Sequence, residues 1–260
     1  MTDPITVLEL AADVPGTLDD IWTAVATGPG MSSWYVPSTV EERSGGATTS
    51  RFGDGPEMLI PGRVAAWEPP RRVLFDGGDE ATAAGGMTFE WTIEDTADGH
   101  RVRLVNTGFP DTPEGQAQKA AMTDGWGLFL HNLQLHLEHF RGQVGTAMLP
   151  MASGPGPRTD VWRHLTAALG VPSAPAAGER LQVSADDAPA LAGRVVQVDS
   201  WRVSLVLHEP APGTAIIAVE GDDENVMISV WLYLYGDTAS AVVERDASRW
   251  AAWLAANAVR

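Results

Sequence analysis

The chain has 260 residues and a formal net charge of −17, and 44% of its residues are hydrophobic, which is enough for one large packed domain or two small ones. Such an acidic surface repels nucleic-acid phosphates and anionic membranes, and the absence of cysteine excludes disulfides, thiolate chemistry and Cys-ligated metals. No stretch approaches the roughly 20 apolar residues of a membrane-spanning helix, and the N-terminus lacks the features of a signal peptide, so we expect a cytoplasmic protein.

The first 110 residues predict a strand, two short helices and a run of antiparallel strands. Residues 5–11 alternate as a strand does, and Thr17 then caps a helix over 18–27 with acidic residues in its first turn. Gly28-Pro29-Gly30 ends this helix, and a second short helix follows at 31–35. Turns rich in Gly, Pro and Asp separate the remaining strands, which we place at residues 38–43, 48–53, 57–67, 72–76, 87–94 and 101–107.

Residues 118–140 are the most informative segment and predict one long amphipathic helix. Apolar side chains recur there every three or four residues and form one broad stripe, which consists of Met122, Trp126, Phe129, Leu130, Leu133, Leu137 and Phe140. The stripe is too wide and too aromatic for a solvent-exposed helix, so the preceding strands must form the sheet on which it packs. A sheet that grips one long helix usually leaves room between them, and the sequence therefore predicts a cavity.

The second half of the chain predicts another, smaller unit. Residues 142–157 are rich in Gly, Pro, Ser and Ala and are expected to link a domain of residues 1–141 to one of residues 158–260. We place the elements of the second domain at a helix over 160–169, strands near 180–184, 191–199, 201–208, 214–220 and 226–235, and a helix over 246–258. Helix, meander and terminal helix thus repeat the order of the first domain without its opening strand, which indicates a degenerate tandem duplication.

Three segments carry a family resemblance, namely Gly28-Pro-Gly-Met-Ser-Ser-Trp-Tyr-Val-Pro37, Gly62-Arg-Val-Ala-Ala-Trp-Glu-Pro-Pro-Arg-Arg72 and Gly125-Trp-Gly-Leu-Phe-Leu-His-Asn-Leu133. They are similar to the SRPBCC superfamily and, within it, to the branch named for similarity to the activator of the heat-shock protein 90 ATPase. Over about residues 5–141 the resemblance implies an α+β helix-grip (START-like) fold, in which a curved antiparallel sheet wraps a long C-terminal helix and encloses an apolar pocket. The superfamily includes carriers, polyketide cyclases, hydrolases and co-chaperone-like modules, so the resemblance is specific for fold and not for activity.

The expected pocket supplies the candidate ligand-binding residues. Trp34 and Tyr35 lie at the end of the second short helix, where the family's pocket tends to open. The aromatic side chains of the strand and of the long helix are expected to face one another. These aromatic residues would either line the cavity or fill the core. Asn106 and Asn132 are the polar groups that could anchor a ligand. The candidate site comprises Trp34, Tyr35, Phe89, Trp91, Asn106, Trp126, Leu130 and Leu133.

Catalytic and metal-binding patterns are weak in this chain. It has no nucleophile elbow, phosphate loop or Rossmann glycine fingerprint. Glu90 and Arg103 are expected on adjacent strands, facing away from the apolar side, where they would form a solvated ion pair. His136 and His139 lie one turn apart on the long helix, at the margin of the stripe or beyond, and without a further ligand we expect them to be solvated. We therefore predict no metal and no cofactor.

The sequence favours binding of a small hydrophobic or amphipathic molecule by residues 1–141, without catalysis. Two alternatives remain open. A polyketide cyclase- or hydrolase-like enzyme would need a titratable group in the pocket, and Glu90, Arg103 and His131 are the candidates. A protein-interaction module, as the family name implies, would need a filled cavity and a large exposed apolar patch. The sequence does not decide whether the protein forms a homodimer.

Overall fold

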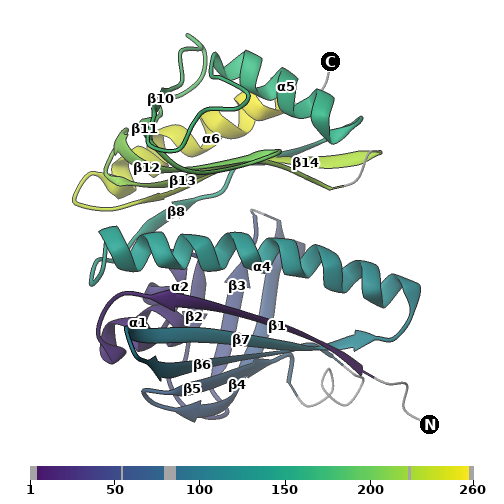
Figure 1. Cartoon of the computed structure of the whole chain (residues 1–260), viewed down its shortest axis with the longest axis vertical. Coiled ribbons are helices and arrows are strands. Elements are labelled where there is room, and N and C mark those ends of the chain that lie inside the picture. The colour runs from purple at the N-terminus through teal and green to yellow at the C-terminus, as the bar shows by residue number, and fades with distance from the viewer. Residues whose placement is uncertain (1–4, 54, 79–85, 222–223, 258–260) are drawn as a thin grey trace. The chain divides into compact units, whose positions relative to one another are not determined.

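The computed structural model describes residues 5–53, 55–78, 86–221 and 224–257. The chain divides into two compact units, Met1–Val144 (unit 1) and Gly145–Arg260 (unit 2). Each unit has its own seven-stranded antiparallel sheet and its own helices (Figure 1). None of the helices in the described residues is long and apolar enough to span a bilayer.

The sheet of unit 1 has the order β1-β7-β6-β5-β4-β3-β2, and every neighbouring pair is antiparallel. Its strands are β1 (Ile5–Val14), β2 (Ser38–Val40), β3 (Ala47–Arg51), β4 (Leu59–Glu68), β5 (Arg72–Asp76), β6 (Thr88–Thr96) and β7 (Gly99–Pro110). The alternation predicted for β6 is confirmed, since Trp91 and Ile93 are buried and Glu94 is exposed. The meander from β2 to β7 therefore presents one apolar face.

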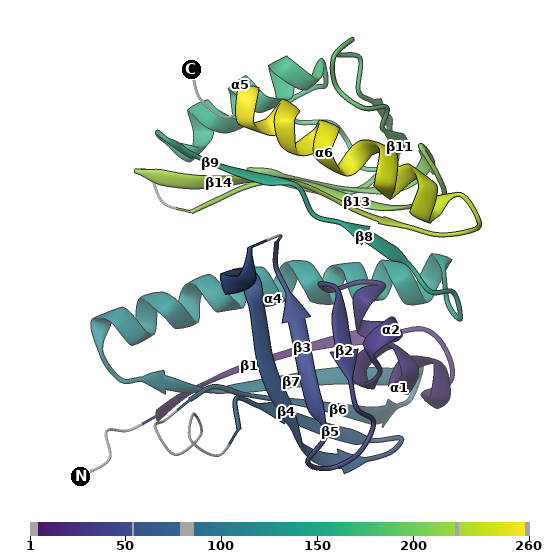
Figure 2. The ribbon, with the colours of Figure 1, turned by 180° about the vertical axis from the view of Figure 1, so that it is seen from behind.

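Among the described residues of unit 1, three helices cover this face, namely α1 (Leu18–Ala26), α2 (Gly28–Ser32) and α4 (Pro113–His139). The long helix begins five residues before the predicted start. Thr112 caps it, because the Thr112 hydroxyl accepts a hydrogen bond from the Gly115 amide at 3.1 Å, and proline is tolerated at the first helical position. Figure 2 shows β2, β3 and β4 passing beside α4, with α1 and α2 at one end of the sheet.

The predicted stripe on α4 is confirmed, because its side chains from Trp126 to Phe140 are buried and Met122 is partly buried. The helix contacts β1 and β7 most closely, while β2 to β5 curve away from it. A long helix held by a curved antiparallel sheet is the helix-grip arrangement that the family resemblance implies. Unit 1 therefore has the predicted α+β helix-grip fold.

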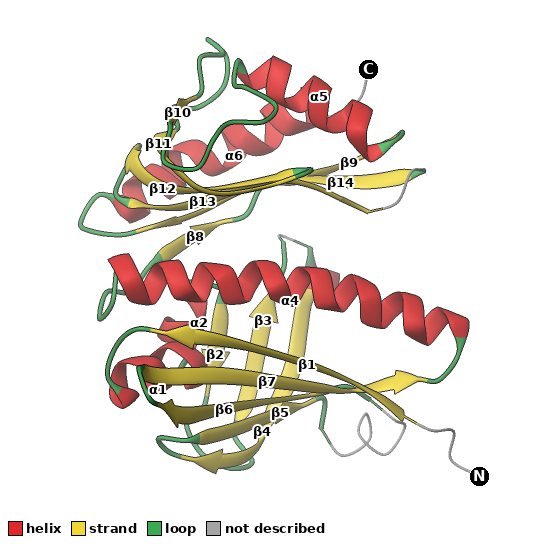
Figure 3. Ribbon diagram, in the orientation of Figure 1, coloured by secondary structure: helices red, strands yellow, loops and turns green. Residues whose placement is uncertain are grey.

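The sheet of unit 2 has the order β10-β11-β12-β13-β14-β8, and β9 also pairs with β14. The elements of this unit are β8 (Thr146–Met148), β9 (Met151–Pro155), α5 (Arg158–Leu169), β10 (Arg180–Gln182), β11 (Ala192–Asp199), β12 (Arg202–Glu209), β13 (Gly213–Gly221), β14 (Asn225–Leu234) and α6 (Ala239–Asn257). From α5 onward they follow the predicted order of helix, strands and terminal helix, but β8 and β9 precede α5, so the prediction that this unit lacks an opening strand is wrong. Both helices lie over the same face of the sheet (Figure 3).

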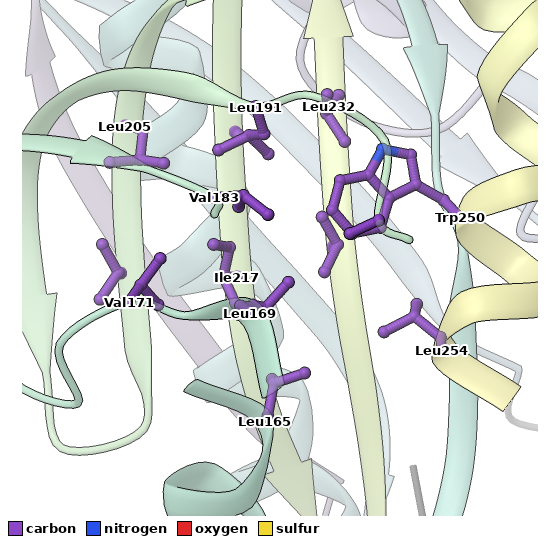
Figure 4. Packing of buried hydrophobic residues seen from close by; sticks show 14 of the residues in the cluster. Leu165, Leu169, Val171, Val183, Leu191, Leu205, Ile217, Leu232, Trp250 and Leu254 are labelled. Atoms are coloured by element: carbon purple, nitrogen blue, oxygen red, sulfur yellow. The ribbon is translucent and has the colours of Figure 1, made fainter. Parts of the chain in front are cut away.

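Aliphatic side chains and tryptophan fill the space between this sheet and its two helices. Leu165 of α5 and Trp250 of α6 point toward Leu205, Ile217 and Leu232 of the central strands (Figure 4). All five side chains are almost fully buried. The helix-facing side of unit 2 is therefore a packed hydrophobic core.

Two strands lie within residues 142–157, the segment that was expected to be a linker, and take up half of it. Residues 146–148 form β8 and pair with 232–234, and residues 151–155 form β9 and pair with 225–229 of β14. The Gly, Pro and Ala content of 142–157 hid these strands, because backbone pairing along a neighbouring strand needs no alternation of apolar side chains.

Candidate functional site

A pocket of about 350 Å³ lies within unit 1, between the sheet and the first half of α4. Its volume is near the lower end of the range typical of small-molecule sites, roughly 300 to 1,000 Å³. Strands β2 to β6, the segment at α2 and the helix α4 all contribute to its wall. Six aromatic residues line it, namely Tyr35, Phe52, Phe75, Phe89, Trp91 and Trp126.

Trp126 is the centre of this aromatic wall. Its ring is stacked on Tyr35, with centroids 5.1 Å apart and planes 19° apart. The ring of Trp91 meets it edge-on at 5.4 Å, and that of Phe89 lies tilted at 5.7 Å. Offset stacked and edge-on arrangements are the favoured geometries of aromatic pairs, so the wall is held in a defined shape without a ligand.

The aromatic wall also carries two polar groups. Burial raises the pKa of the Tyr35 phenol, so this hydroxyl stays protonated at neutral pH. The indole Nε1 of Trp126 is buried and has no hydrogen-bond partner in the described part of the chain. A buried donor without a partner carries a desolvation penalty, which a bound oxygen atom would relieve.

Hydroxyl groups line the pocket on β2 and β3. In the strand register Ser38 lies opposite Ser50, and Val40 lies opposite Thr48, so these side chains share one face of the sheet. The hydroxyls of Ser38 and Ser50 are 3.3 Å apart and share a hydrogen bond. This side of the pocket is therefore polar but uncharged.

Gly62 on β4 keeps the space beside these hydroxyls open. A Cβ atom at this position would lie 2.7 Å from the Thr48 hydroxyl and 3.0 Å from the Asp76 carbonyl oxygen. Both distances are shorter than ordinary van der Waals contacts, so any larger residue would intrude on the pocket or displace the strand.

The described lining includes one acidic residue, Asp76 at the end of β5, whose side chain lies on the opposite face of the strand from Phe75. Arg63 holds the Asp76 carboxylate with two hydrogen bonds, from Nε to Oδ1 at 3.1 Å and from Nη2 to Oδ2 at 2.8 Å. The Gly78 amide donates a third bond to Oδ1 at 2.9 Å. The Asp76 side chain is only 5% exposed, and its charge is balanced by the guanidinium rather than left for a ligand.

The structure brings four of the predicted ligand-binding residues together in the pocket, namely Tyr35, Phe89, Trp91 and Trp126. Trp34 lies outside the lining and is fully buried. Its indole Nε1 donates to the Ala24 carbonyl at 2.9 Å, and its own carbonyl accepts from the Asn132 amide at 2.8 Å. Trp34 therefore ties α1 to α4 and fixes the backbone that positions the neighbouring phenol.

Three further candidates also lie outside the described lining. Leu130 and Leu133 are buried in the core between α4 and the sheet. Asn106 is fully buried on β7, opposite Phe89 in the register, and its amide donates to the Thr88 carbonyl at 2.9 Å. Its Oδ1 has no partner among the described residues. Asn106 is therefore a buried polar group next to Phe89 and does not line the pocket.

The predicted pair of Glu90 with Arg103 is not formed. Glu90 instead pairs with Arg72 at 2.6 Å, and Arg103 pairs with Glu9 at 2.6 Å. The register explains the change, because Glu90 lies opposite Val105 on β7 and is therefore diagonal to Arg103. These charged side chains lie on the outer face, as predicted, and none of them lines the pocket.

His136 corrects a second expectation, because it is only 4% exposed rather than solvated. It follows Asn132 by four residues on α4, so both side chains lie on the same side of the helix, and Asn132 is bonded to the α2 segment. Burial lowers the pKa of His136 from 6.5 to about 4. His139 keeps a quarter of its side chain exposed. No cluster of three metal-ligating side chains occurs among the described residues.

Sequence reasoning missed the hydroxyl side of the pocket. Strands 38–43 and 48–53 were expected, but short Ser- and Thr-rich strands show no apolar alternation that would identify the inward face. The strand register was needed to place Ser38, Thr48 and Ser50 on the pocket side. Gly62 was the signal that could have located this side of the pocket. A glycine inside a strand often marks a place where a ligand or another backbone approaches the strand closely.

Several known proteins are similar to this chain. Residues 16–138 match the family model described as Activator of Hsp90 ATPase homolog 1-like protein, and no curated protein matches. DynU16, a protein in the dynemicin biosynthetic locus, aligns at 19% identity over 96% of both chains with a TM-score of 0.44. The Aha1 dimer from Colwellia psychrerythraea aligns at 18% identity over 53% of this chain and 99% of its own, with a TM-score of 0.44. CalU16 from Micromonospora echinospora aligns at 17% identity over 52% of this chain and 76% of its own, with a TM-score of 0.38.

Proposed function

We propose that unit 1, in which residues 16–138 match the Activator of Hsp90 ATPase homolog 1-like family model, binds a small apolar or amphipathic molecule in its pocket. The observation that carries this proposal is the open space of about 350 Å³ beside Trp91 and Trp126. Side chains as large as these normally pack into a close-packed protein interior without leaving such a space. Burial of the ligand's apolar surface would supply the binding free energy, at roughly 25 cal/mol per Å².

The two alternatives receive less support. The catalytic hypothesis depended on Glu90, Arg103 or His131 reaching the cavity, and none of them belongs to the described lining. The one acidic residue in the described lining, Asp76, has its carboxylate already held by Arg63. The protein-interaction hypothesis needed a filled cavity, whereas the pocket of unit 1 is open.

Native mass spectrometry of the full chain, followed by denaturing extraction, tests the proposal. We expect a stoichiometric apolar compound, or, if the protein is purified empty, saturable binding of the neutral dye N-phenyl-1-naphthylamine. The same spectra give the oligomeric state, which the sequence leaves open between a monomer and a homodimer.

Two matched variants of α4 assign the binding to the pocket. Met122→Trp fills the cavity from its lining, whereas Ala121→Trp adds the same side chain at an exposed neighbouring position. The first variant should abolish dye or compound binding and the second should retain it. The proposal would be contradicted if the wild-type protein carried no co-purified compound and did not bind the dye. It would also be contradicted if both variants bound the dye equally well.

A further inference from the structure

The charges around the pocket limit the ligand to a neutral molecule. In the described lining the only charged residue is Asp76, and Arg63 already neutralises its carboxylate through two hydrogen bonds. No lysine, arginine or histidine belongs to that lining. An isolated carboxylate or phosphate transferred into such a pocket would lose its hydration without gaining a cation. The head group of a fatty acid therefore finds no partner here.

The shape of the aromatic wall favours a flat ligand. Tyr35 and Trp126 are stacked, and Trp91 stands edge-on to the indole of Trp126. A planar ring system can continue these stacked and edge-on contacts, which contribute beyond the area that they bury. A flexible alkyl chain would also lose rotational freedom in a pocket of about 350 Å³, whereas a rigid ring has little to lose.

The hydroxyl side of the pocket requires polar atoms on one edge of that ligand. Ser38, Thr48 and Ser50 lie on the same face of β2 and β3, and a hydroxyl group can donate or accept a hydrogen bond. The buried indole N–H of Trp126, which has no partner among the described residues, adds a further donor. A purely aliphatic or aromatic hydrocarbon would displace water from these groups without replacing its hydrogen bonds.

From these three features we infer that the ligand is a neutral, flat aromatic molecule with hydroxyl or carbonyl oxygens along one edge, and not a fatty acid or other aliphatic lipid. The rings would lie against Tyr35 and Trp126, and the oxygens would face Thr48 and Ser50. This inference rests on the proposed function, because it specifies what the same pocket binds.

Displacement of N-phenyl-1-naphthylamine from the full chain by four compounds tests each feature separately. The compounds are 1,5-dihydroxynaphthalene, naphthalene, 1-naphthoate and 1-decanol, which vary the oxygens, the charge and the flatness. We expect 1,5-dihydroxynaphthalene to bind most tightly. Naphthalene should bind roughly tenfold more weakly, which corresponds to the loss of one or two hydrogen bonds, and the other two compounds more weakly still.

Hydroxyl-deletion variants locate the polar edge. Thr48→Val keeps the shape of the side chain and should weaken 1,5-dihydroxynaphthalene by roughly three- to tenfold while leaving naphthalene unchanged. Ser50→Ala is the second variant, for use if the first fails to fold. Thr92→Val is the matched control, because Thr92 lies on the opposite face of β6 from Trp91 and its hydroxyl has no partner among the described residues. The control should change neither affinity.

The outcomes separate this inference from the proposed function. If 1-decanol or 1-naphthoate binds as tightly as 1,5-dihydroxynaphthalene, the pocket is real and the inferred ligand class is wrong. Equal weakening of naphthalene and 1,5-dihydroxynaphthalene by Thr48→Val and Ser50→Ala overturns the polar edge. If the dye itself shows no binding that Met122→Trp abolishes, the proposed function fails first.

Discussion

The two units of this chain each have a seven-stranded antiparallel sheet, but one sheet borders a pocket and the other a packed core. Unit 1 holds one long helix, α4, against its sheet and keeps a pocket of about 350 Å³ beside it. Unit 2 covers its sheet with two helices, α5 and α6, and fills the space beneath them with apolar side chains (Figure 4). A repeated order of elements therefore does not determine whether the helix-facing side of a sheet becomes a pocket or a core.

The inward side chains of the strands make this difference. On β2 and β3 of unit 1 they are small and hydroxylated, as at Ser38, Thr48 and Ser50, and β4 has a glycine beside them. On β12 and β13 of unit 2 they are aliphatic, as at Leu205 and Ile217. Small polar residues leave volume that a single helix cannot fill, whereas branched and leucine side chains interdigitate to native density.

The largest expected effect follows from truncating one side chain of similar size in each unit. Leu205→Ala in unit 2 removes buried methyl groups from a closed core and should lower the free energy of unfolding by about 3 kcal/mol. Met122→Ala in unit 1 enlarges a space that already exists, so it should cost less than about 1 kcal/mol. Urea denaturation of the full chain, followed by hydrogen exchange of peptides from each unit, measures both losses separately.

Similar losses for the two variants would contradict the contrast between pocket and core. Leu205→Met provides the control, because it conserves most of the side-chain volume and should cost less than about 1.5 kcal/mol. If this variant were as unstable as Leu205→Ala, the measured loss would reflect altered shape rather than a cavity.

The second prediction concerns acid sensitivity of unit 1, which contains the buried His136. Its pKa falls from 6.5 to about 4 because burial disfavours the charged imidazole. Above pH 6.5 the side chain is neutral in both states and contributes nothing to the pH dependence. Between pH 6.5 and 4 the unfolded chain binds a proton that the folded chain does not, so stability should fall by about 2–3 kcal/mol across this window.

Comparison with His136→Gln isolates this contribution, because the acidic residues titrate alike in both proteins. The wild-type protein should lose stability relative to the variant from pH 6.5 downward, and the difference should level off below pH 4. NMR titration of the His136 ring gives the pKa directly. A ring that titrates near pH 6.5 would show that the side chain is solvated, as the sequence alone implied.

The sequence predicted the elements of both units well, because the signals for them are local. The stripe from Trp126 to Phe140 requires only helical periodicity, and the strand around Trp91 requires only alternation. Strands β8 and β9 were missed because their pairing with β14 is determined by the neighbouring strand and not by their own composition. Long-range pairing was therefore the part of the fold that could not be predicted.

The site was predictable only on its aromatic side. Tyr35 and Trp126 stand out in any sequence because large aromatic residues either fill a core or line a pocket. The hydroxyl side depends on which face of the two short strands β2 and β3 turns inward, and their sequences do not show this. The pairing of Glu90 with Arg103 failed for a similar reason, because the register of β6 against β7 places Glu90 opposite Val105. His136 was misplaced for a related reason, since the width of a buried helix face depends on what packs beside it.

The smallest expected effect concerns the start of α1, where the sequence alone predicted the local structure. The Thr17 hydroxyl accepts from the Asp20 amide at 3.2 Å, and the Asp20 carboxylate accepts from the Thr17 amide at 2.9 Å, which completes a capping box. The first helix of unit 2, α5, has Pro157 at its N-cap position and no side-chain cap hydrogen bond. Of these two helices, only α1 therefore gains stability from a side-chain cap.

Thr17→Ala should lower the free energy of unfolding of unit 1 by about 1 kcal/mol and leave hydrogen exchange in unit 2 unchanged. Thr17→Ser retains the capping oxygen and should recover most of the loss, which separates the cap from the methyl group of threonine. Helix α1 leads into α2 and then into the turn that contains Tyr35. Faster hydrogen exchange in Thr17→Ala should therefore extend to residues 28–35 without reaching β6. Equal acceleration along the whole of unit 1 would mean that the cap stabilises the unit globally rather than this corner of the pocket.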